Sequence, residues 1–256
     1  MGELDPALSG RELVVKAPPL GDELIRGIRL ISPQFRLRAQ SEHSRDFWQR
    51  NQNGLCWSEY EAIAPVLDAM PRPSKVLDIG PGMGRSVVFF KKKMGWNDVP
   101  FHLYESTGED TNYTKAGPRF DDSFCGNWDA MAEVLEYNGI EGVERFDAAD
   151  LDAKLSNLPG PYDFIYSFYA IGFHWSLEHF LDEILGLCHD RTIGVFTLHD
   201  RFDRFETLGD VPYRVVPMKE SWPRESWRRL LILSPQEDNL QALGSGSEAG
   251  QVQVGG

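Results

Sequence analysis

Basic residues are scarce in this sequence. Its 256 residues include 26 Lys and Arg against 39 Asp and Glu, which gives a formal net charge of −13. Proteins that bind nucleic acids need clustered positive side chains to displace the counterions of the phosphates. The deficit of positive charge therefore predicts that neither DNA nor RNA is a partner.

Cysteine and long apolar runs are scarce as well. Cys56, Cys125 and Cys188 lie far apart and form no CxxC pair, so we predict neither a zinc site nor a disulfide framework. No stretch approaches the ~20 apolar residues of a membrane-spanning helix. The N-terminus, "MGELDPALSG", lacks the basic and apolar regions of a signal peptide. We expect a cytoplasmic protein without membrane association.

The spacing of apolar residues divides the chain into four parts. Residues 1–21 mix Pro, Gly and charged residues and predict an irregular arm, and helical periodicity predicts an N-terminal helical cap over 22–73. Short β-like runs then alternate with helical ones, which predicts one domain over 74–235. The polar, Gly- and Ser-rich segment 236–256 is predicted to be a disordered tail.

The alternation within the domain predicts an α/β fold. Strands are expected at 75–79, 101–105, 143–147, 162–167 and 192–198, and helices at 85–94, 128–137 and 176–188, with Ser176 as the N-cap of the last helix. Such alternation favours a doubly wound, mostly parallel sheet. Two final runs, 213–217 and 227–234, are joined by too few residues for a crossover helix. They predict a C-terminal antiparallel hairpin and a sheet of seven strands.

The most informative motif is "VLDIGPGMGRS" at 76–86, where three glycines alternate behind an apolar strand. A glycine turn between a strand and a helix lets a ligand approach bare backbone amides. The dinucleotide fingerprint GxGxxG requires a glycine at 85, where Arg85 stands, and no GK[ST] of a P-loop follows. The spacing is DxGxGxG, and glycines needed only for the geometry of a tight turn remain the alternative.

This motif resembles the first motif of the class I S-adenosylmethionine-dependent methyltransferases. The resemblance covers about residues 75–234, and it implies S-adenosyl-L-methionine as cofactor. It implies that the glycine backbone contacts the methionine part and the ribose, that Glu105 accepts the ribose hydroxyls, and that Asp147 with Ala148, in "RFDAADL", binds the adenine. Asp150 is the alternative acid. The residues expected to bind the cofactor are Asp78, Gly80, Gly82, Gly84, Glu105, Ser106, Asp147, Ala148, Ser167 and Phe168.

Methyl transfer is an in-line displacement that needs two aligned reactants, and a base only if the acceptor must lose a proton. Tyr169 and His174 follow the fourth predicted strand and His199 follows the fifth, at the edge where active sites of doubly wound sheets open. They are the candidate catalytic residues. His174 packed under the loop is the alternative, and His199 with Asp200 could also be a metal-ligand pair or a helix cap. We predict no metal.

Two segments depart from the family pattern, 106–127 and 199–212, and the second leaves little room for a full helix after the fifth predicted strand. The segment 106–127 is a long loop where a helix usually follows the second strand. We hypothesise that it forms a lid over the substrate together with the N-terminal helices, with Trp48, Trp57 and Tyr60 as an aromatic wall. An aromatic helix face that belongs to the ordinary core is the alternative.

The resemblance predicts methyl transfer to a small molecule, with a hydroxyl oxygen of a sugar or a natural-product-like metabolite as the favoured acceptor. No "NPPY"-like tetrapeptide, which marks many enzymes that methylate planar amino groups, follows the fourth strand, where "SFYA" stands. A methyltransferase-like module that binds the cofactor without catalysis is the alternative. A nicotinamide dehydrogenase is disfavoured by Arg85. The sequence specifies neither the acceptor nor the oligomeric state.

Overall fold

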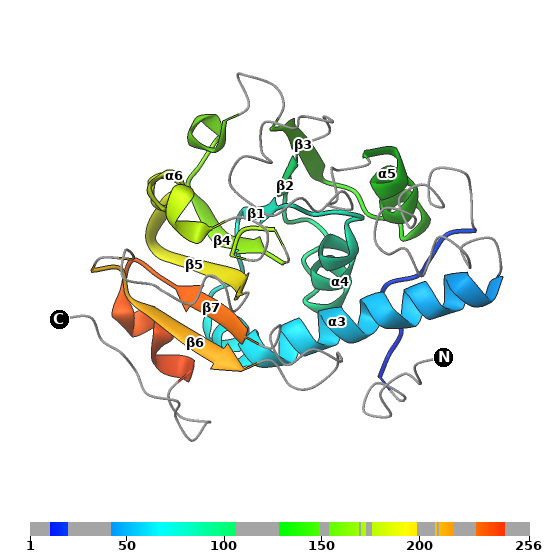
Figure 1. Cartoon of the computed structure of the whole chain (residues 1–256), viewed down its shortest axis with the longest axis horizontal. Helices are drawn as coiled ribbons and strands as arrows, with labels where there is room; N and C mark the ends of the chain where they lie inside the picture. Colours follow the sequence, from blue (N-terminus) through cyan, green and yellow to red (C-terminus); the bar gives the residue numbers. More distant parts are fainter. Residues whose placement is uncertain are drawn as a thin grey trace.

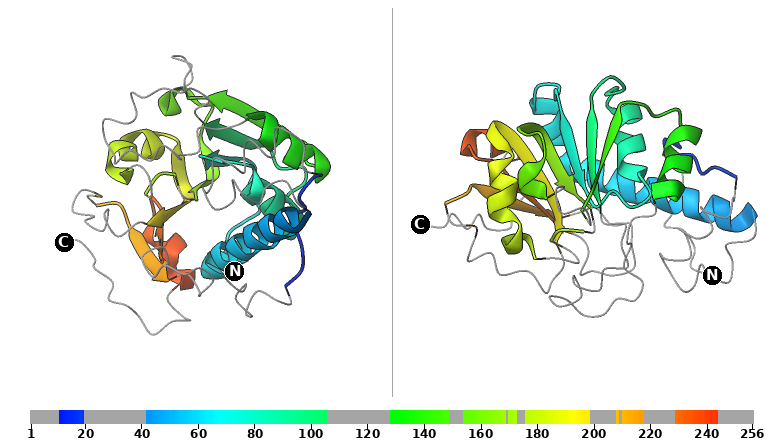
Figure 2. Two further views of the ribbon diagram at one scale, coloured as in Figure 1. Left: turned by 45° about the vertical axis from the view of Figure 1, so that its right-hand side comes forward. Right: turned by 90° about the horizontal axis from the view of Figure 1, so that it is seen from above.

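The structure of the chain is a computed structural model that describes a large part of the sequence. The described residues are 11–19, 42–105, 128–148, 154–168, 170–172, 176–198, 208, 210–217 and 229–243. Within them, one seven-stranded sheet forms the centre of the molecule, with helices on both of its faces (Figures 1 and 2). The predicted α/β fold is confirmed.

The strand order is β3-β2-β1-β4-β5-β7-β6. The strands are β1 (Val76–Ile79), β2 (Phe101–Glu105), β3 (Val143–Asp147), β4 (Tyr162–Ser167), β5 (Cys188–Leu198), β6 (Tyr213–Pro217) and β7 (Arg229–Leu233). The first five run parallel, and β7 is antiparallel to both β5 and β6. The predicted C-terminal hairpin is therefore confirmed. The order reverses between β1 and β4, and ligands of such sheets bind at this switch point, beyond the carboxyl ends of the strands.

Alternate residues of each strand point to two separate apolar layers, as the period of two requires. On one face, Val76 of β1 packs with α3 (Glu42–Ala69), α4 (Arg85–Lys93) and α5 (Trp128–Tyr137). On the other face, Leu77 packs with η3 (Leu155–Asn157), η4 (Leu177–His179) and α6 (Leu181–Gly186). Figure 1 shows α3 running beside α4 toward η7 (Glu237–Leu243).

The helix predicted over 176–188 is shorter and interrupted. A single turn of 3-10 helix, η4, precedes α6, and Ser176 makes no side-chain capping bond. The strand predicted to start at 192 starts at Cys188 instead. The reason is pairing, because Cys188 lies opposite Tyr162 of β4 and is drawn into the sheet despite its helical periodicity.

The predicted irregular arm has no regular secondary structure in its described part, 11–19, but it is firmly attached. Asn53 on α3 accepts bonds from Val14 N and Val15 N (2.8 and 2.9 Å) and donates to Val15 O (2.6 Å). Asn138, after α5, exchanges two bonds with the backbone of Lys16 (2.7 and 3.0 Å). The side-chain amides of Asn53 and Asn138 thus bond the backbone N–H and C=O groups of the arm, as the backbone of a neighbouring strand would.

The predicted helical cap is helical in its described part, but two of its aromatic residues pack into the core. The described part of the cap is one helix, α3, and its Ile63 is fully buried in the core. Trp57 and Tyr60 pack against Phe89 of α4, with ring centroids at 5.3 and 5.8 Å, so they belong to the core and not to a lid wall. The other parts of the hypothesised lid are Trp48 and the segment 106–127. The side chain of Trp48 and all of 106–127 lie outside the described residues.

The tail was predicted to be disordered from residue 236. Instead, η7 folds back on α3 and buries Leu240, which is 1% exposed. Asn239 Nδ2 donates to the backbone oxygen of Asp190 at 2.8 Å. The sequence prediction failed because the few apolar residues of this polar segment, Leu240 and Leu243 among them, are too few to establish a periodicity, although a buried Leu240 and the bond from Asn239 dock the short helix.

Candidate cofactor site

The glycine loop connects β1 to α4 at the switch point of the sheet. Gly80 has a φ of 75°, and its amide donates to Tyr104 O at 2.8 Å. A Cβ atom on Gly80 would lie 2.3 Å from the Cβ of Ala170, in the segment that follows β4. Both the backbone conformation and the close approach therefore require glycine here.

Gly84 has a different role within the same loop. It is the N-cap of α4, in the left-handed region at φ 71°, and a Cβ atom there would lie 3.0 Å from side-chain atoms of Met131 and Leu135 on α5. This glycine allows α4 to pack against α5. Gly84 is therefore required by geometry, and its predicted backbone contact with the cofactor stays a prediction.

Gly82 connects the loop to the next strand. Its backbone amide, at φ 55°, donates a hydrogen bond of 3.3 Å to Oε2 of Glu105, the last residue of β2. Glu105 is only 9% exposed, so this carboxylate lies against the bare backbone of the loop and not in open solvent. The structure therefore brings together the glycine loop and the acid that the resemblance assigns to the ribose.

The acid assigned to adenine lies beside Glu105. Asp147 ends β3 and is opposite Glu105 in the parallel pairing of β2 with β3. The amide of Ala148 donates to the backbone oxygen of Glu105 at 2.7 Å. Glu105, Asp147 and Ala148 therefore share one edge of the sheet, next to the glycine loop.

Asp78 occupies a different environment, beneath the loop. It is 1% exposed, and Ser86 of α4 donates to its Oδ2 at 3.0 Å. Burial raises the pKa of Asp78 to about 7, although contacts with Tyr166, Ser86 and Arg85 oppose the rise. The buried Tyr166 hydroxyl makes no hydrogen bond of good geometry within the described residues, and burial followed by the charge of Asp78 raises its pKa strongly.

Ser167 and Phe168 use their side chains within the fold. The Ser167 hydroxyl donates to Ile79 O (2.7 Å) and accepts from Ile171 N (2.9 Å), so it connects the ends of β4 and β1. Phe168 is 6% exposed and packs against Tyr166, with ring centroids at 5.0 Å. Neither side chain is available to a ligand, and only their backbone could serve the cofactor role predicted for them.

The candidate catalytic residues are not part of this geometry. Ser106, Asp150, Tyr169, His174, His199 and Asp200 all lie outside the described residues. Among the residues that are described, no group of three His, Cys, Asp or Glu side chains could hold a metal ion, and no helix is both long and apolar enough to cross a membrane. The identity of a catalytic base therefore stays a prediction from the positions of these residues after the fourth and fifth strands in the sequence.

Sequence reasoning missed one pair at this site. Arg85, the first residue of α4, makes two hydrogen bonds to Glu59 of α3, Nη1 to Oε2 at 2.8 Å and Nη2 to Oε1 at 2.6 Å. Glu59 is 1% exposed. A signal for it exists in the sequence, because Glu59 falls on the apolar stripe of α3 between Cys56 and Ile63, where a charge requires a partner.

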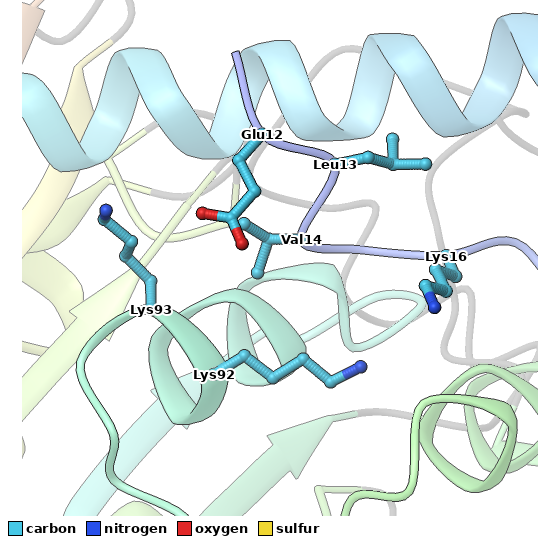
Figure 3. Close-up of a pocket in the computed structure, with 6 residues that line it drawn as sticks. All are labelled: Glu12, Leu13, Val14, Lys16, Lys92 and Lys93. Atoms are coloured by element: carbon cyan, nitrogen blue, oxygen red, sulfur yellow. The ribbon is translucent and has the colours of Figure 1, made fainter.

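A groove of about 350 Å³ lies at the opposite end of α4 from the glycine loop (Figure 3). It is lined by Glu12, Leu13, Val14, Lys16, Lys92 and Lys93. Lys93 lies 4.7 Å from the ring centroid of Trp57, and Figure 3 shows the side chains of Lys92 and Lys93 extending in different directions. The lysines do not converge on one point, and the groove is separate from the candidate cofactor site.

No protein-family model and no curated protein matches this sequence. Among solved structures, the chain is similar to the SAH-bound methyltransferase PaMTH1 of Podospora anserina, with 12% identity over 86% of this chain and 89% of that one and a TM-score of 0.46. It is similar to the plantazolicin methyltransferase BpumL in complex with a monoazolic desmethylPZN analog and SAH, with 10% identity over 85% of this chain and 98% of that one and a TM-score of 0.45. It also resembles a SAM-dependent methyltransferase from Aquifex aeolicus, with 16% identity over 70% of this chain and 93% of that one and a TM-score of 0.45. At these values the likeness concerns the fold alone.

Proposed function

We propose that this protein is a class I S-adenosylmethionine-dependent methyltransferase acting on a small molecule. The observation that carries the proposal is the hydrogen bond from Gly82 N to Glu105 Oε2, 3.3 Å long, at the switch point of the sheet. It joins bare loop backbone to a carboxylate at the end of the neighbouring strand. In the family that the DxGxGxG motif resembles, these two elements hold the methionine part and the ribose of the cofactor.

The residues present fit a nucleoside with free ribose hydroxyls better than a dinucleotide. A carboxylate at the end of β2 accepts hydrogen bonds from ribose hydroxyls in either class of ligand, so it is the glycine loop that distinguishes them. The residue that should be the third glycine of a dinucleotide loop is Arg85, and its side chain is occupied by Glu59. These contacts support S-adenosylmethionine over a nicotinamide cofactor.

When bound, the cofactor would supply an electrophilic methyl group on a sulfonium. The residues of this chain would bind and orient that cofactor. Glu105 would accept the ribose hydroxyls, Asp147 and the amide of Ala148 would hold the adenine, and the loop backbone at Gly80 and Gly82 would hold the methionine part. Alignment of two reactants and exclusion of water can lower the barrier by about 7–11 kcal/mol.

We infer that the acceptor atom is an oxygen of a hydroxylated metabolite, such as a sugar or a natural-product-like compound. A hydroxyl must lose its proton, and the candidate bases Tyr169, His174 and His199 follow β4 and β5 in the sequence. The net charge of −13 disfavours a polyanionic substrate. Cys56 and Cys188 are free thiols, as in proteins of a reducing compartment such as the cytoplasm.

The test is a binding measurement followed by a turnover assay. Calorimetry should give saturable binding of S-adenosylmethionine and of S-adenosylhomocysteine, and none of NAD. Incubation with S-adenosylmethionine and mixtures of hydroxylated metabolites should then release S-adenosylhomocysteine. Binding of NAD alone would refute the proposed cofactor, and binding of S-adenosylmethionine without product across broad acceptor mixtures would refute the enzyme.

A further inference from the structure

The ion pair between Glu59 and Arg85 joins the glycine loop to a helix outside the βα units of the sheet. Arg85 directly follows Gly84, and its guanidinium extends away from the loop to α3, where both of its terminal nitrogens bond both oxygens of Glu59 (2.6 and 2.8 Å). Nη1 also lies 3.1 Å from Cys56 Sγ. Such a two-pronged contact specifies direction as well as distance.

Stability alone does not account for a pair this deeply buried. The Glu59 and Arg85 side chains are 1% and 10% exposed, and burial raises the pKa of Glu59 against the opposing effect of Arg85. The desolvation of two charges cancels much of their attraction, and apolar residues of similar volume often stabilise such positions equally well. What an apolar contact cannot supply is a directional constraint on the first turn of α4.

The residue after Arg85 is held from the opposite side. The Ser86 hydroxyl donates to Asp78 of β1 at 3.0 Å. Two consecutive residues at the start of α4 are therefore held by α3 on one side and by the sheet on the other. The first amides of a helix have no intrahelical acceptor, and they adjoin the loop from which Gly82 reaches Glu105.

We propose that Glu59 is a positioning residue for the cofactor: through Arg85 it holds the start of α4, and with it the Gly80–Gly84 loop, in the conformation that binds S-adenosylmethionine. This inference rests on the function proposed above. It assigns to α3 a part in cofactor affinity although α3 carries none of the residues expected to contact the cofactor. A second helix residue offers a control, because Glu61 of α3 forms a more exposed pair with Arg11 (2.8 Å; side chains 26% and 25% exposed).

The decisive variant replaces both charges by apolar residues, Glu59→Leu with Arg85→Met. Because no charge is left unpaired, its melting temperature without ligand should lie close to that of the wild type. Its dissociation constant for S-adenosylhomocysteine should rise at least tenfold. Glu61→Gln should leave that constant unchanged. A double variant with wild-type affinity would overturn the inference and leave the proposed function intact.

Two further measurements keep the test decisive. Arg85→Lys keeps the charge but cannot make both hydrogen bonds, so it should fold and still weaken S-adenosylhomocysteine binding several-fold, and wild-type affinity in this variant would contradict the positioning role. In turnover assays, Arg85→Lys should raise KM for S-adenosylmethionine and leave KM for the acceptor unchanged. If the wild type itself does not bind S-adenosylhomocysteine, the proposed function fails, and this inference with it.

Discussion

The amide of Gly82, in the loop after β1, donates a 3.3 Å hydrogen bond to the carboxylate of Glu105, the last residue of the neighbouring strand β2. In the proposed function this carboxylate, which is 9% exposed and bonded to the loop backbone, accepts the ribose hydroxyls of the cofactor. Glu105→Gln should therefore weaken S-adenosylhomocysteine binding about 10- to 100-fold, the usual effect of losing hydrogen bonds to a charged acceptor. Calorimetry measures the change.

The control for Glu105 is Glu141→Gln, because Glu141 is exposed before β3. This variant should bind as the wild type does. Unchanged affinity in Glu105→Gln would show that the ligand does not use this carboxylate.

The contact between Gly80 and Ala170 makes a glycine indispensable. In Gly80→Ala the new Cβ would lie 2.3 Å from the Cβ of Ala170, in addition to the cost of φ 75°. Gly95 has a similar φ of 66° with no atom within 4 Å of the added Cβ, so Gly95→Ala carries the backbone cost alone, about 1 kcal/mol. Gly80→Ala should lower the free energy of unfolding in urea by a further 1–3 kcal/mol, roughly the cost of overpacking.

A second substitution tests that explanation of Gly80→Ala. Ala170→Gly removes the Cβ atom that the added Cβ at position 80 would meet. The double variant should therefore lose only about as much free energy of unfolding as Gly95→Ala loses, about 1 kcal/mol. A double variant as unstable as Gly80→Ala would show that the close approach is not the cause.

Asp78 should make the stability of the protein depend on pH. Its pKa is raised from 3.8 to about 7 by burial, so the folded state favours the protonated form more than the unfolded state does. The stabilising contribution of protonated Asp78 is therefore fully present below the pKa that the group has in the unfolded state, and it is lost as the pH rises through about 7. The loss is on the order of 4 kcal/mol at most. Urea unfolding at several pH values measures it, and Asp78→Asn should flatten the profile across this range.

The opposite sign is expected for Asp163, at the start of β4. Burial opposes its ionised form, but hydrogen bonds from Ser74 (2.6 and 2.7 Å) and His189 (2.9 Å) outweigh burial and lower the pKa of Asp163. Its stabilising effect is present above the ordinary carboxyl pKa and is lost as the pH falls through the lowered value. Asp163→Asn should cost about 1–3 kcal/mol near neutral pH, measured by urea unfolding.

Asp190→Asn is the matched control, because Asp190 is exposed and lies next to His189. It should change stability by less than about 0.5 kcal/mol. Equal losses in the two variants would contradict the bonding role of Asp163.

Local sequence patterns predicted the sheet well because strand residues alternate between two buried layers. β2, β3, β4 and β6 begin and end where the apolar runs predicted. The DxGxGxG spacing and the acids at strand ends also indicated correctly which residues meet, since parallel strands place their carboxyl ends at one edge. The cofactor role of Ser167 and Phe168 stays a prediction, and the structure adds that their side chains are engaged within the fold, because a strand-end position does not reveal the direction of a side chain.

By itself, the sequence determined the α/β class, the terminal hairpin, the glycine turn and the order of acids along one edge, because each is encoded within a few neighbouring residues. Only the tertiary structure decided which segments outside the strands pack against one another and against the glycine loop. The bonds of Asn53 and Asn138 to the N-terminal arm, the Glu59–Arg85 pair and the docking of Leu240 on α3 join segments far apart in the chain. Apart from the charge of Glu59 on the apolar stripe of α3, such contacts leave no periodic signal, because one hydrogen-bonding or apolar side chain suffices once packing has brought the segments together.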